Sequence, residues 1–236
     1  MSKLNLNLSA SLNIFKLIAK PSLCLPHATV ATFNDLPIPL NKAFGNGEKK
    51  VDIKAVVLDK DDCFAIPDHN EIYGDYKVGL YLFSSPLRIT SANSAQERME
   101  ALKAAYPGRR LLIVSNTAGA LSWDKDGKMA SAVERATGIT VLPHGVKKPG
   151  CGDEIMSYFR AHPETGVTSP HQIAVVGDRL ATDMMLANMM GSYGIWVKDG
   201  VVPHEKKSIW SRVERSVAPF LVSRGYTAPE PVSPFE

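Results

Sequence analysis

The sequence predicts an α/β fold built on a doubly wound, Rossmann-like parallel sheet without a large cap domain. Three short apolar runs, KAVVL (54–58), LLIV (111–114) and IAVV (173–176), each end in polar residues. Runs of this length that are rich in Val and Ile are typical of buried parallel strands. Segments with helical spacing separate them, and this alternation favours a doubly wound sheet.

The intervening helices have recognisable starts and ends. SAQE (94–97) predicts a capping box that opens a helix, with Pro107 following its end. Residues 130–138 predict a second helix, for which Gly138 is a typical C-terminal stop. ITVLP (139–143) then predicts a strand, and two further helices follow over 152–162 and 182–191. In the last helix we interpret four methionines as core residues: Met184, Met185, Met189 and Met190.

The N-terminal segment, residues 1–26, differs from the rest in composition. The first acidic residue is Asp35, while Leu4, Leu8, Leu12, Phe15 and Ala19 share one helical face and Pro21 would end the helix. Three interpretations stay open: a helix packed on the domain, a mitochondrial transit peptide, or a helix lying in a membrane interface.

The remaining divisions are a main domain over 27–203, a C-terminal helix over 204–226 and a tail over 227–236. The stretch 27–52 is interpreted as a surface connector. The C-terminal helix carries an apolar stripe made of Ile209, Trp210, Val213, Val217 and Phe220. We expect this stripe to pack on the domain, and contact with anionic lipid is the alternative. The Pro-rich tail is expected to be disordered.

Bulk composition excludes several classes of protein. The net charge of +3, from 27 basic and 24 acidic residues, is too balanced to favour a nucleic-acid partner. Three widely spaced cysteines, Cys24, Cys63 and Cys151, indicate free thiols in a reducing compartment. No apolar run approaches the roughly 18 residues that a transmembrane helix needs.

Four motifs carry the chemistry: LDKDD (58–62), VSNTAG (114–119), KKPG (147–150) and GDRLATD (177–183). All but KKPG follow a predicted strand, so their side chains are expected to meet at the carboxyl edge of one sheet, where such folds bind ligands. Carboxylates, a hydroxyl group and a lysine at one edge suit the cleavage of a phosphate ester, which needs charge neutralisation and in-line positioning.

Each residue type has a separate task in that chemistry. Asp59, directly after the first strand, is the expected nucleophile, and Asp61 should face the same side and act as general acid and base. Mg²⁺ prefers carboxylate oxygens, so Asp59, Asp61 and Asp178 are the expected metal ligands. Ser115, Asn116 and Lys148 are expected to bind the phosphoryl group. The supporting residues are Asp183, Lys147 and Arg179.

The order Asp-x-Asp, Ser, Lys, Gly-Asp resembles the haloacid dehalogenase (HAD) superfamily of phosphatases. Further segments resemble its fungal mitochondrial phosphatidylglycerophosphate phosphatases: PSLCLP (21–26), TFNDLPIP (32–39), AVVLDKDDC (55–63), KKPGC (147–151), AVVGDRLATD (174–183) and GSYGIWVKDGV (191–201). One departure is Asp62, where the resemblance implies Asn; an added carboxylate there can alter metal affinity or the pKa of Asp61.

The resemblance implies Mg²⁺-dependent hydrolysis of phosphatidylglycerophosphate to phosphatidylglycerol and phosphate, a step toward cardiolipin. It further implies a phospholipid substrate, peripheral membrane contact, no nucleic-acid partner, and a place on the matrix face of the mitochondrial inner membrane. The short spacings between motifs leave no room for a large cap, which fits an open site. A phosphatase for a soluble monoester or phosphoprotein, and a catalytically silent HAD scaffold, are the alternatives.

Overall fold

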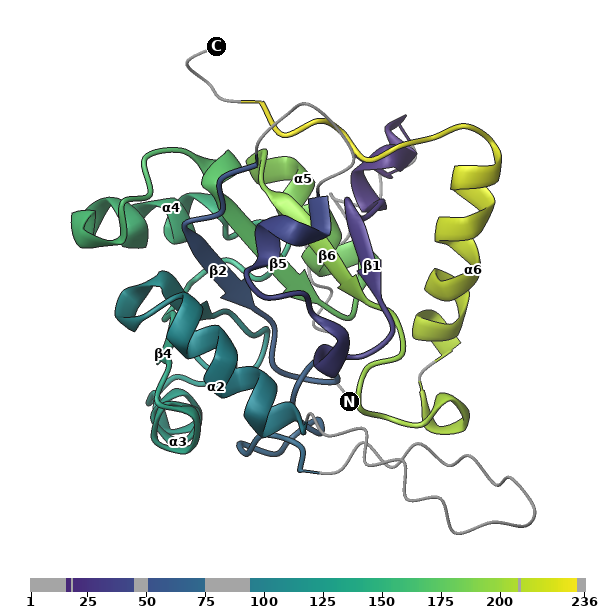
Figure 1. Cartoon of the computed structure of the whole chain (residues 1–236). Coiled ribbons are helices and arrows are strands. Elements are labelled where there is room, and N and C mark those ends of the chain that lie inside the picture. Colours follow the sequence, from purple (N-terminus) through teal and green to yellow (C-terminus); the bar gives the residue numbers. More distant parts are fainter. Residues whose placement is uncertain (1–15, 18, 45–50, 75–93, 208, 233–236) are drawn as a thin grey trace, which may run out of the picture.

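The predicted doubly wound parallel sheet is confirmed by the computed structural model, which describes residues 16–17, 19–44, 51–74, 94–207 and 209–232 (Figure 1). Six parallel strands lie in the order β1-β6-β5-β2-β3-β4. Their bounds are β1 (Ala28–Val30), β2 (Ala55–Leu58), β3 (Leu111–Ile113), β4 (Thr140–Val141), β5 (Ile173–Gly177) and β6 (Tyr193–Val197).

Helices cover both faces of this sheet (Figure 1). One face is covered by α2 (Ala95–Ala105) and α3 (Lys128–Thr137), the other by α4 (Gly152–Ala161) and α5 (Met185–Met190), while α6 (Ile209–Ser223) stands beside the β1 edge. Short 3₁₀ and π segments complete the fold: η1 (Pro21–Cys24), η2 (Phe33–Asp35), η3 (Leu40–Phe44), η4 (Gly108–Arg110), η5 (Pro163–Thr165), η6 (Pro170–Gln172), η7 (Leu180–Met184) and η8 (His204–Lys206).

Strand β2 shows how the core is divided between the two faces. Val56 and Leu58 pack with α2 and α3, whereas Ala55 and Val57 pack with α4 and α5. All four residues are buried. This is the reason that a central parallel strand is apolar throughout and does not alternate with polar residues.

The predicted helix boundaries are largely confirmed. The Ser94 hydroxyl accepts the Glu97 N–H at 3.2 Å and the Glu97 carboxylate accepts the Ser94 N–H at 3.2 Å, which is the capping box of α2. Gly138 ends α3 with a φ of +70°, a conformation that glycine adopts without steric cost. Of the four methionines, Met184 and Met185 are fully buried, but Met189 is exposed.

The connector over 27–52 is part of the core, so its interpretation as a surface loop is wrong. It contributes β1, which pairs with β6, and the two short helical segments η2 and η3. Phe33, Leu36 and Leu40 are fully buried, and the rings of Phe33 and Phe64 lie 5.8 Å apart. Residues 45–50, which contain the GNGEKK motif, lie outside the described residues.

Most of the predicted N-terminal helix also lies outside the described residues. Residues 16, 17 and 19 are helical, and η1 begins at Pro21, as expected for a helix that proline terminates. Among the described residues, no helix combines the length and the hydropathy needed to cross a bilayer.

The C-terminal segments differ from expectation in two ways. Helix α6 buries Ala218 and Leu221, whereas Val213 and Phe220 of the predicted stripe are 48% and 56% exposed. The tail is ordered from 227 to 232: the His27 Nε2–H donates to the Pro229 carbonyl at 2.9 Å, because Nδ1 accepts the Gly194 N–H. The prediction of a disordered tail is therefore wrong for residues 227–232.

Spacing between the motifs agrees with the absence of a large cap over the described residues. Only α3 and its flanking loops separate β3 from β4. Between β2 and α2, residues 59–74 form a loop at the end of the sheet, and residues 75–93 lie outside the described part.

The buried connector leads to a first prediction. Phe33→Ala should lower the free energy of unfolding by about 3–5 kcal/mol, because it leaves a cavity against Phe64. Phe220→Ala, which truncates the same residue type on an exposed face, should cost less than about 1 kcal/mol. Denaturant unfolding followed by circular dichroism measures both, and equal effects would show that the connector does not belong to the cooperative core.

Candidate active site

The candidate site lies at the topological switch point of the sheet. From β2 the chain proceeds through β3 to β4 on one side, then returns to β5 on the other side of β2. Asp59 follows β2 and Asp178 follows β5, and the Asp59 N–H donates to the Val176 carbonyl at 2.8 Å. The connection that leaves β2 and the connection that leaves β5 therefore go to opposite sides. Such a divergence of the connections leaves a crevice at the carboxyl ends of the two strands.

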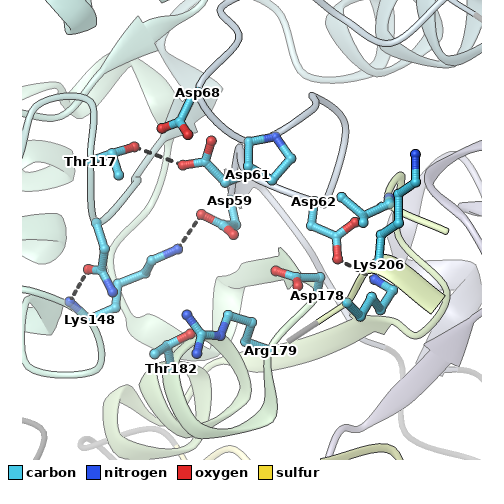
Figure 2. A pocket seen from close by; sticks show the side chains of 14 residues that line it. Asp59, Asp61, Asp62, Asp68, Thr117, Lys148, Asp178, Arg179, Thr182 and Lys206 are labelled. Atoms are coloured by element: carbon cyan, nitrogen blue, oxygen red, sulfur yellow. Dashed lines mark hydrogen bonds and ion pairs between the residues drawn. The ribbon is translucent and has the colours of Figure 1, made fainter. Parts of the chain in front are cut away.

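That crevice is a cleft of about 510 Å³ (Figure 2). Its lining brings together most of the predicted residues with several others: Asp59, Asp61, Asp62, Pro67, Asp68, Asn116, Thr117, Lys148, Asp178, Arg179, Thr182, Val202, Lys206 and Lys207. Asp59 and Asp61 both face it, as strand alternation predicted.

A buried ion-pair triad, Asp59–Lys148–Asp183, occupies the floor of the cleft. The Lys148 Nζ lies 2.6 Å from an oxygen of Asp59 and 2.6 Å from an oxygen of Asp183. The three side chains are no more than 8% exposed. Burial alone would lower the pKa of Lys148, but the Asp183 and Asp59 carboxylates reverse this and hold it above its usual value. Lys148 is therefore a permanent ammonium group beside the expected nucleophile.

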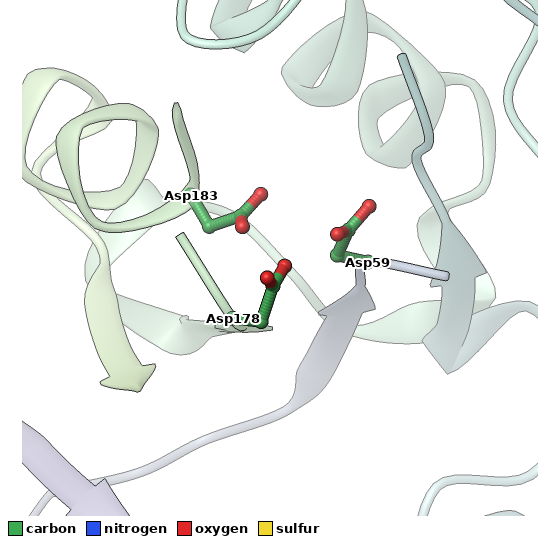
Figure 3. A group of neighbouring side chains, drawn as sticks. All are labelled: Asp59, Asp178 and Asp183. Atoms are coloured by element: carbon green, nitrogen blue, oxygen red, sulfur yellow. The ribbon is translucent and has the colours of Figure 1, made fainter. Parts of the chain in front are cut away.

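Three carboxylates converge around this ammonium group: Asp59, Asp178 and Asp183 each place an oxygen within 4.8 Å of the others (Figure 3). Burial raises the pKa of Asp59 to about 6 even though Lys148 opposes the shift. Burial, and then the nearby Asp59 charge, raise the pKa of Asp178 well above its usual value.

Asp178 also has a buried oxygen, Oδ1, without a hydrogen-bond donor among the described residues. One lysine leaves excess negative charge in this group, and a hard divalent cation is the ligand that carboxylate oxygens of this kind accommodate. The donor set therefore fits a divalent metal ion.

Asp61 does not belong to the converging group. One of its carboxylate oxygens accepts hydrogen bonds from the Thr117 hydroxyl at 2.7 Å and the Ser115 hydroxyl at 3.2 Å. The other oxygen forms an ion pair with the buried Lys60. The predicted set of metal-binding side chains, Asp59, Asp61 and Asp178, thus differs from the observed group, in which Asp183 takes the place of Asp61.

The predicted phosphate-binding residues occupy different depths. Ser115 is fully buried behind Asp61, and its hydroxyl lies 2.8 Å from that of Thr117. Asn116 lines the cleft, and its side-chain oxygen accepts the Lys148 N–H at 2.8 Å. This bond joins the loop after β3 to the loop that carries Lys148.

The predicted supporting residues are not equivalent. Besides contacting Lys148, the Asp183 carboxylate accepts the Arg179 N–H at 3.1 Å. A Cβ atom at Gly177 would lie 2.3 Å from the carboxylate carbon of Asp183, so only glycine fits there. Arg179 lines the cleft, whereas the Lys147 Nζ lies 5.5 Å from the centre of the Trp123 ring and does not line it.

Asp62 is an anchor for the loop that follows β6. Its backbone has a φ of +59°, its carboxylate accepts the N–H groups of Val201 at 2.8 Å and Val202 at 2.6 Å, and it forms an ion pair with the buried Lys207. The charge of Asp62 is thus matched by Lys207. Sequence reasoning did not assign Lys60, Thr117 and Lys207, nor three further polar residues of the lining, Asp68, Thr182 and Lys206. Local signals existed for Lys60, which stands between Asp59 and Asp61, and for Thr117, two residues after Ser115.

The two adjacent lysines allow a matched comparison. Lys148→Ala should lower kcat/KM for p-nitrophenyl phosphate by about 100-fold or more, because two buried carboxylates lose their cation and the cleft loses its fixed positive charge. Lys147→Ala should change it less than about twofold. Steady-state kinetics on both variants, with melting temperatures as the control for folding, measure this; equal losses would contradict the assignment of Lys148 to the site.

Known proteins are similar to this chain over most of its length. Residues 8–202 match the family described as mitochondrial PGP phosphatase, where PGP is phosphatidylglycerophosphate. The mitochondrial phosphatidylglycerophosphatase of Saccharomyces cerevisiae is 45% identical over 196 residues, which cover 83% of this chain and 89% of that protein. A probable mitochondrial phosphatidylglycerophosphatase of Schizosaccharomyces pombe is 31% identical and covers 78% of each chain.

A chloroplastic relative extends the comparison beyond fungi. The phosphatidylglycerophosphate phosphatase 1 of Chlamydomonas reinhardtii is 31% identical over 75% of this chain and 54% of its own length. The match over residues 8–202 and the identity to the Saccharomyces protein together show that this chain is a phosphatase and belongs to the mitochondrial PGP phosphatase family.

Proposed function

We propose that this phosphatase hydrolyses phosphatidylglycerophosphate to phosphatidylglycerol and inorganic phosphate, in the biosynthesis of cardiolipin. The observation that carries the proposal is the Asp59 carboxylate at the switch point, paired with Lys148 in an open cleft. The names of the fungal relatives, which cover more than three quarters of the chain, support the substrate.

In the first half of the reaction, an Asp59 oxygen attacks the phosphorus of the monoester and forms an aspartyl-phosphate. The bond between phosphorus and the glycerol oxygen breaks, and Asp61 gives a proton to the departing alkoxide. The hydrogen bonds from Thr117 and Ser115 hold Asp61 in place for this transfer.

In the second half, a water molecule attacks the phosphorus of the aspartyl-phosphate. Asp61, now a carboxylate, takes a proton from that water, and the bond between phosphorus and the Asp59 oxygen breaks. Phosphate leaves, Asp59 is restored as a carboxylate, and Asp61 carries the proton that the next leaving group needs.

The phosphoryl group would be held by Lys148, Asn116 and Ser115. Lys148 and Asn116 face the cleft; the Ser115 hydroxyl would have to exchange its present partners to reach it. Asp59 and Asp178, with Asp183 beside them, would hold Mg²⁺. When bound, this ion supplies positive charge that offsets the negative phosphoryl oxygens.

We further propose that the enzyme acts at the matrix face of the mitochondrial inner membrane, as a peripheral protein. The two fungal relatives carry mitochondrial names, which supports the organelle. Residues 1–26 would serve in targeting, membrane association or both; residues 27–203 would form the catalytic domain, followed by the C-terminal helix over 204–226.

Two carboxylates test the mechanism. Asp59→Asn should abolish turnover while the protein stays folded, because the amide is nearly isosteric but cannot attack phosphorus. Asp61→Asn should slow turnover by ~10² to 10⁴, the usual effect of losing a general acid and base. Asp126→Asn, at an exposed site, is the control. Phosphate release from lipid and soluble monoesters measures all three, and a wild-type preference for soluble esters would contradict the lipid substrate.

The metal proposal predicts that chelation abolishes activity, that Mg²⁺ restores it, and that Asp178→Asn imitates the chelated enzyme. Metal affinity should also fall as the pH drops below about 6, because Asp59, with a pKa of about 6, then takes up a proton that the metal must displace. Titration calorimetry at two pH values measures the affinity. Full activity in excess chelator would show that no metal is needed.

A further inference from the structure

The loops that bring polar residues into the cleft also carry exposed apolar side chains. The loop after β3 supplies Asn116 and Thr117 to the cleft and, a few residues later, presents Leu121 and Trp123 at 52% and 65% exposure. The loop after β4 supplies Lys148 and presents Val146 at 46% exposure. We call Leu121, Trp123 and Val146 the loop patch.

The two loops run side by side. The Leu121 N–H donates to the His144 carbonyl at 3.0 Å, the His144 N–H donates to the Gly119 carbonyl at 2.9 Å, and the Lys147 ammonium lies 5.5 Å from the centre of the Trp123 ring. The loop patch is therefore one surface shared by both loops, at the same edge of the sheet as the cleft.

This surface is held rigidly. The buried Asp124 carboxylate accepts the N–H groups of Gly119 at 3.0 Å, Met129 at 3.0 Å and Ala130 at 2.8 Å, which ties the loop to the start of α3. Because these bonds fix the backbone, Trp123 cannot reach the core by a small rearrangement. An exposed apolar surface on a rigid support is typical of an interaction site.

Two lysines at the loop patch have no carboxylate partner among the described residues: Lys125 is exposed and Lys147 is half-buried against Trp123. The nearby carboxylates each have donors of their own: Asp126 pairs with Lys128 at 2.6 Å, the buried Asp124 accepts three N–H groups, and Glu154 accepts the N–H groups of Gly145 at 2.7 Å and Val146 at 3.4 Å. Trp is the side chain that most favours the boundary between water and lipid, and nearby lysines favour anionic headgroups. Apolar side chains with a cationic rim match an anionic bilayer.

We propose that the loop patch is the surface through which this phosphatase sits on an anionic phospholipid bilayer. The inference rests on the proposed lipid substrate. Insertion of Leu121, Trp123 and Val146 below the headgroups would place the mouth of the cleft at the level of the phosphate groups. The enzyme would then reach its substrate without extracting it from the membrane.

Helix α6 provides an internal comparison. Val213, Phe220 and Val222 are 48%, 56% and 59% exposed, so α6 also presents exposed apolar side chains, of which Val213 and Phe220 share one face of the helix. None of the described residues of α6 lines the cleft. A bilayer that covered α6 would therefore have no direct route to Asp59, and these three exposed residues are the matched control.

The experiment uses the full chain and vesicles of phosphatidylcholine with about 20–30 mol% cardiolipin, whose anionic headgroups attract nearby lysines. In co-sedimentation, the triple variant Leu121→Ser/Trp123→Ser/Val146→Ser should bind vesicles with an affinity at least about tenfold lower than that of the wild type. Its kcat/KM on vesicle-borne phosphatidylglycerophosphate should fall by the same factor. Hydrolysis of soluble p-nitrophenyl phosphate and the melting temperature should not change. The variant Val213→Ser/Phe220→Ser/Val222→Ser should bind vesicles as the wild type does.

Two further readouts report on the contact itself. Brominated lipids should quench the tryptophan fluorescence of the wild type, and Trp123→Phe should remove most of that quenching while keeping the binding. Lys125→Gln and Lys147→Gln should each weaken binding about fivefold at low salt and less at high salt.

The proposal is overturned if the loop-patch variant binds vesicles as well as the wild type does, or if the α6 variant loses binding instead. It is also overturned if the loop-patch variant changes the oligomeric state, because a second copy of the chain would then be the occupant of the loop patch. If the proposed function is wrong but the membrane contact is right, the result differs: vesicle binding still depends on the loop patch, but the wild type does not hydrolyse phosphatidylglycerophosphate.

Discussion

The site depends on the buried ammonium group of Lys148, which lies between the carboxylates of Asp59 and Asp183. Buried carboxylates repel one another and tend to take up protons, so a group of three needs positive charge to stay ionised. Lys148 supplies one charge, and an oxygen of Asp178 stays without a hydrogen-bond partner among the described residues. The arrangement is thus suited to a further cation and to an anionic substrate that Lys148 can contact.

The rest of the fold holds this group of charges in place. The switch point of the sheet sets Asp59 beside Asp178, and Asn116 fixes the backbone of Lys148. C-terminal residues add three polar ties to the site loops: Lys207 to Asp62, Glu214 to the Leu180 N–H at 3.2 Å, and Arg215 to Asp199 at 2.5 Å. The C-terminal helix is therefore part of the support of the site, although its residues lie outside the four motifs.

Sequence reasoning succeeded where the determinants are local. The strands of the central sheet are continuous apolar runs, and the cleft residues follow them directly, so the edge of the sheet and its carboxylates could be predicted. It did not foresee the partners of Asp61: Ser115, Thr117 and Lys60 bind its carboxylate, so Asp61 faces the cleft but stays outside the group of converging carboxylates. It also failed at β1, whose three residues are too few to show a pattern.

The other errors concern contacts between distant segments. Phe33 lies among Pro and Asn residues that favour a loop, and only its packing against Phe64 places it in the core. In α6 apolar residues occur on more than one face, so periodicity could not identify Ala218 and Leu221 as the buried ones. Asp62 and Lys207 are 145 positions apart, and no local pattern links them.

The central claim is that Asp59 carries the phosphoryl group during turnover. The most direct measurement is to quench the enzyme during hydrolysis of phosphatidylglycerophosphate, reduce it with borohydride and sequence the peptides by mass spectrometry. Borohydride reduces an acyl phosphate to an alcohol, so this account predicts homoserine at position 59 only when substrate is present. An unmodified Asp59, or modification at another residue, under conditions of rapid turnover would contradict it.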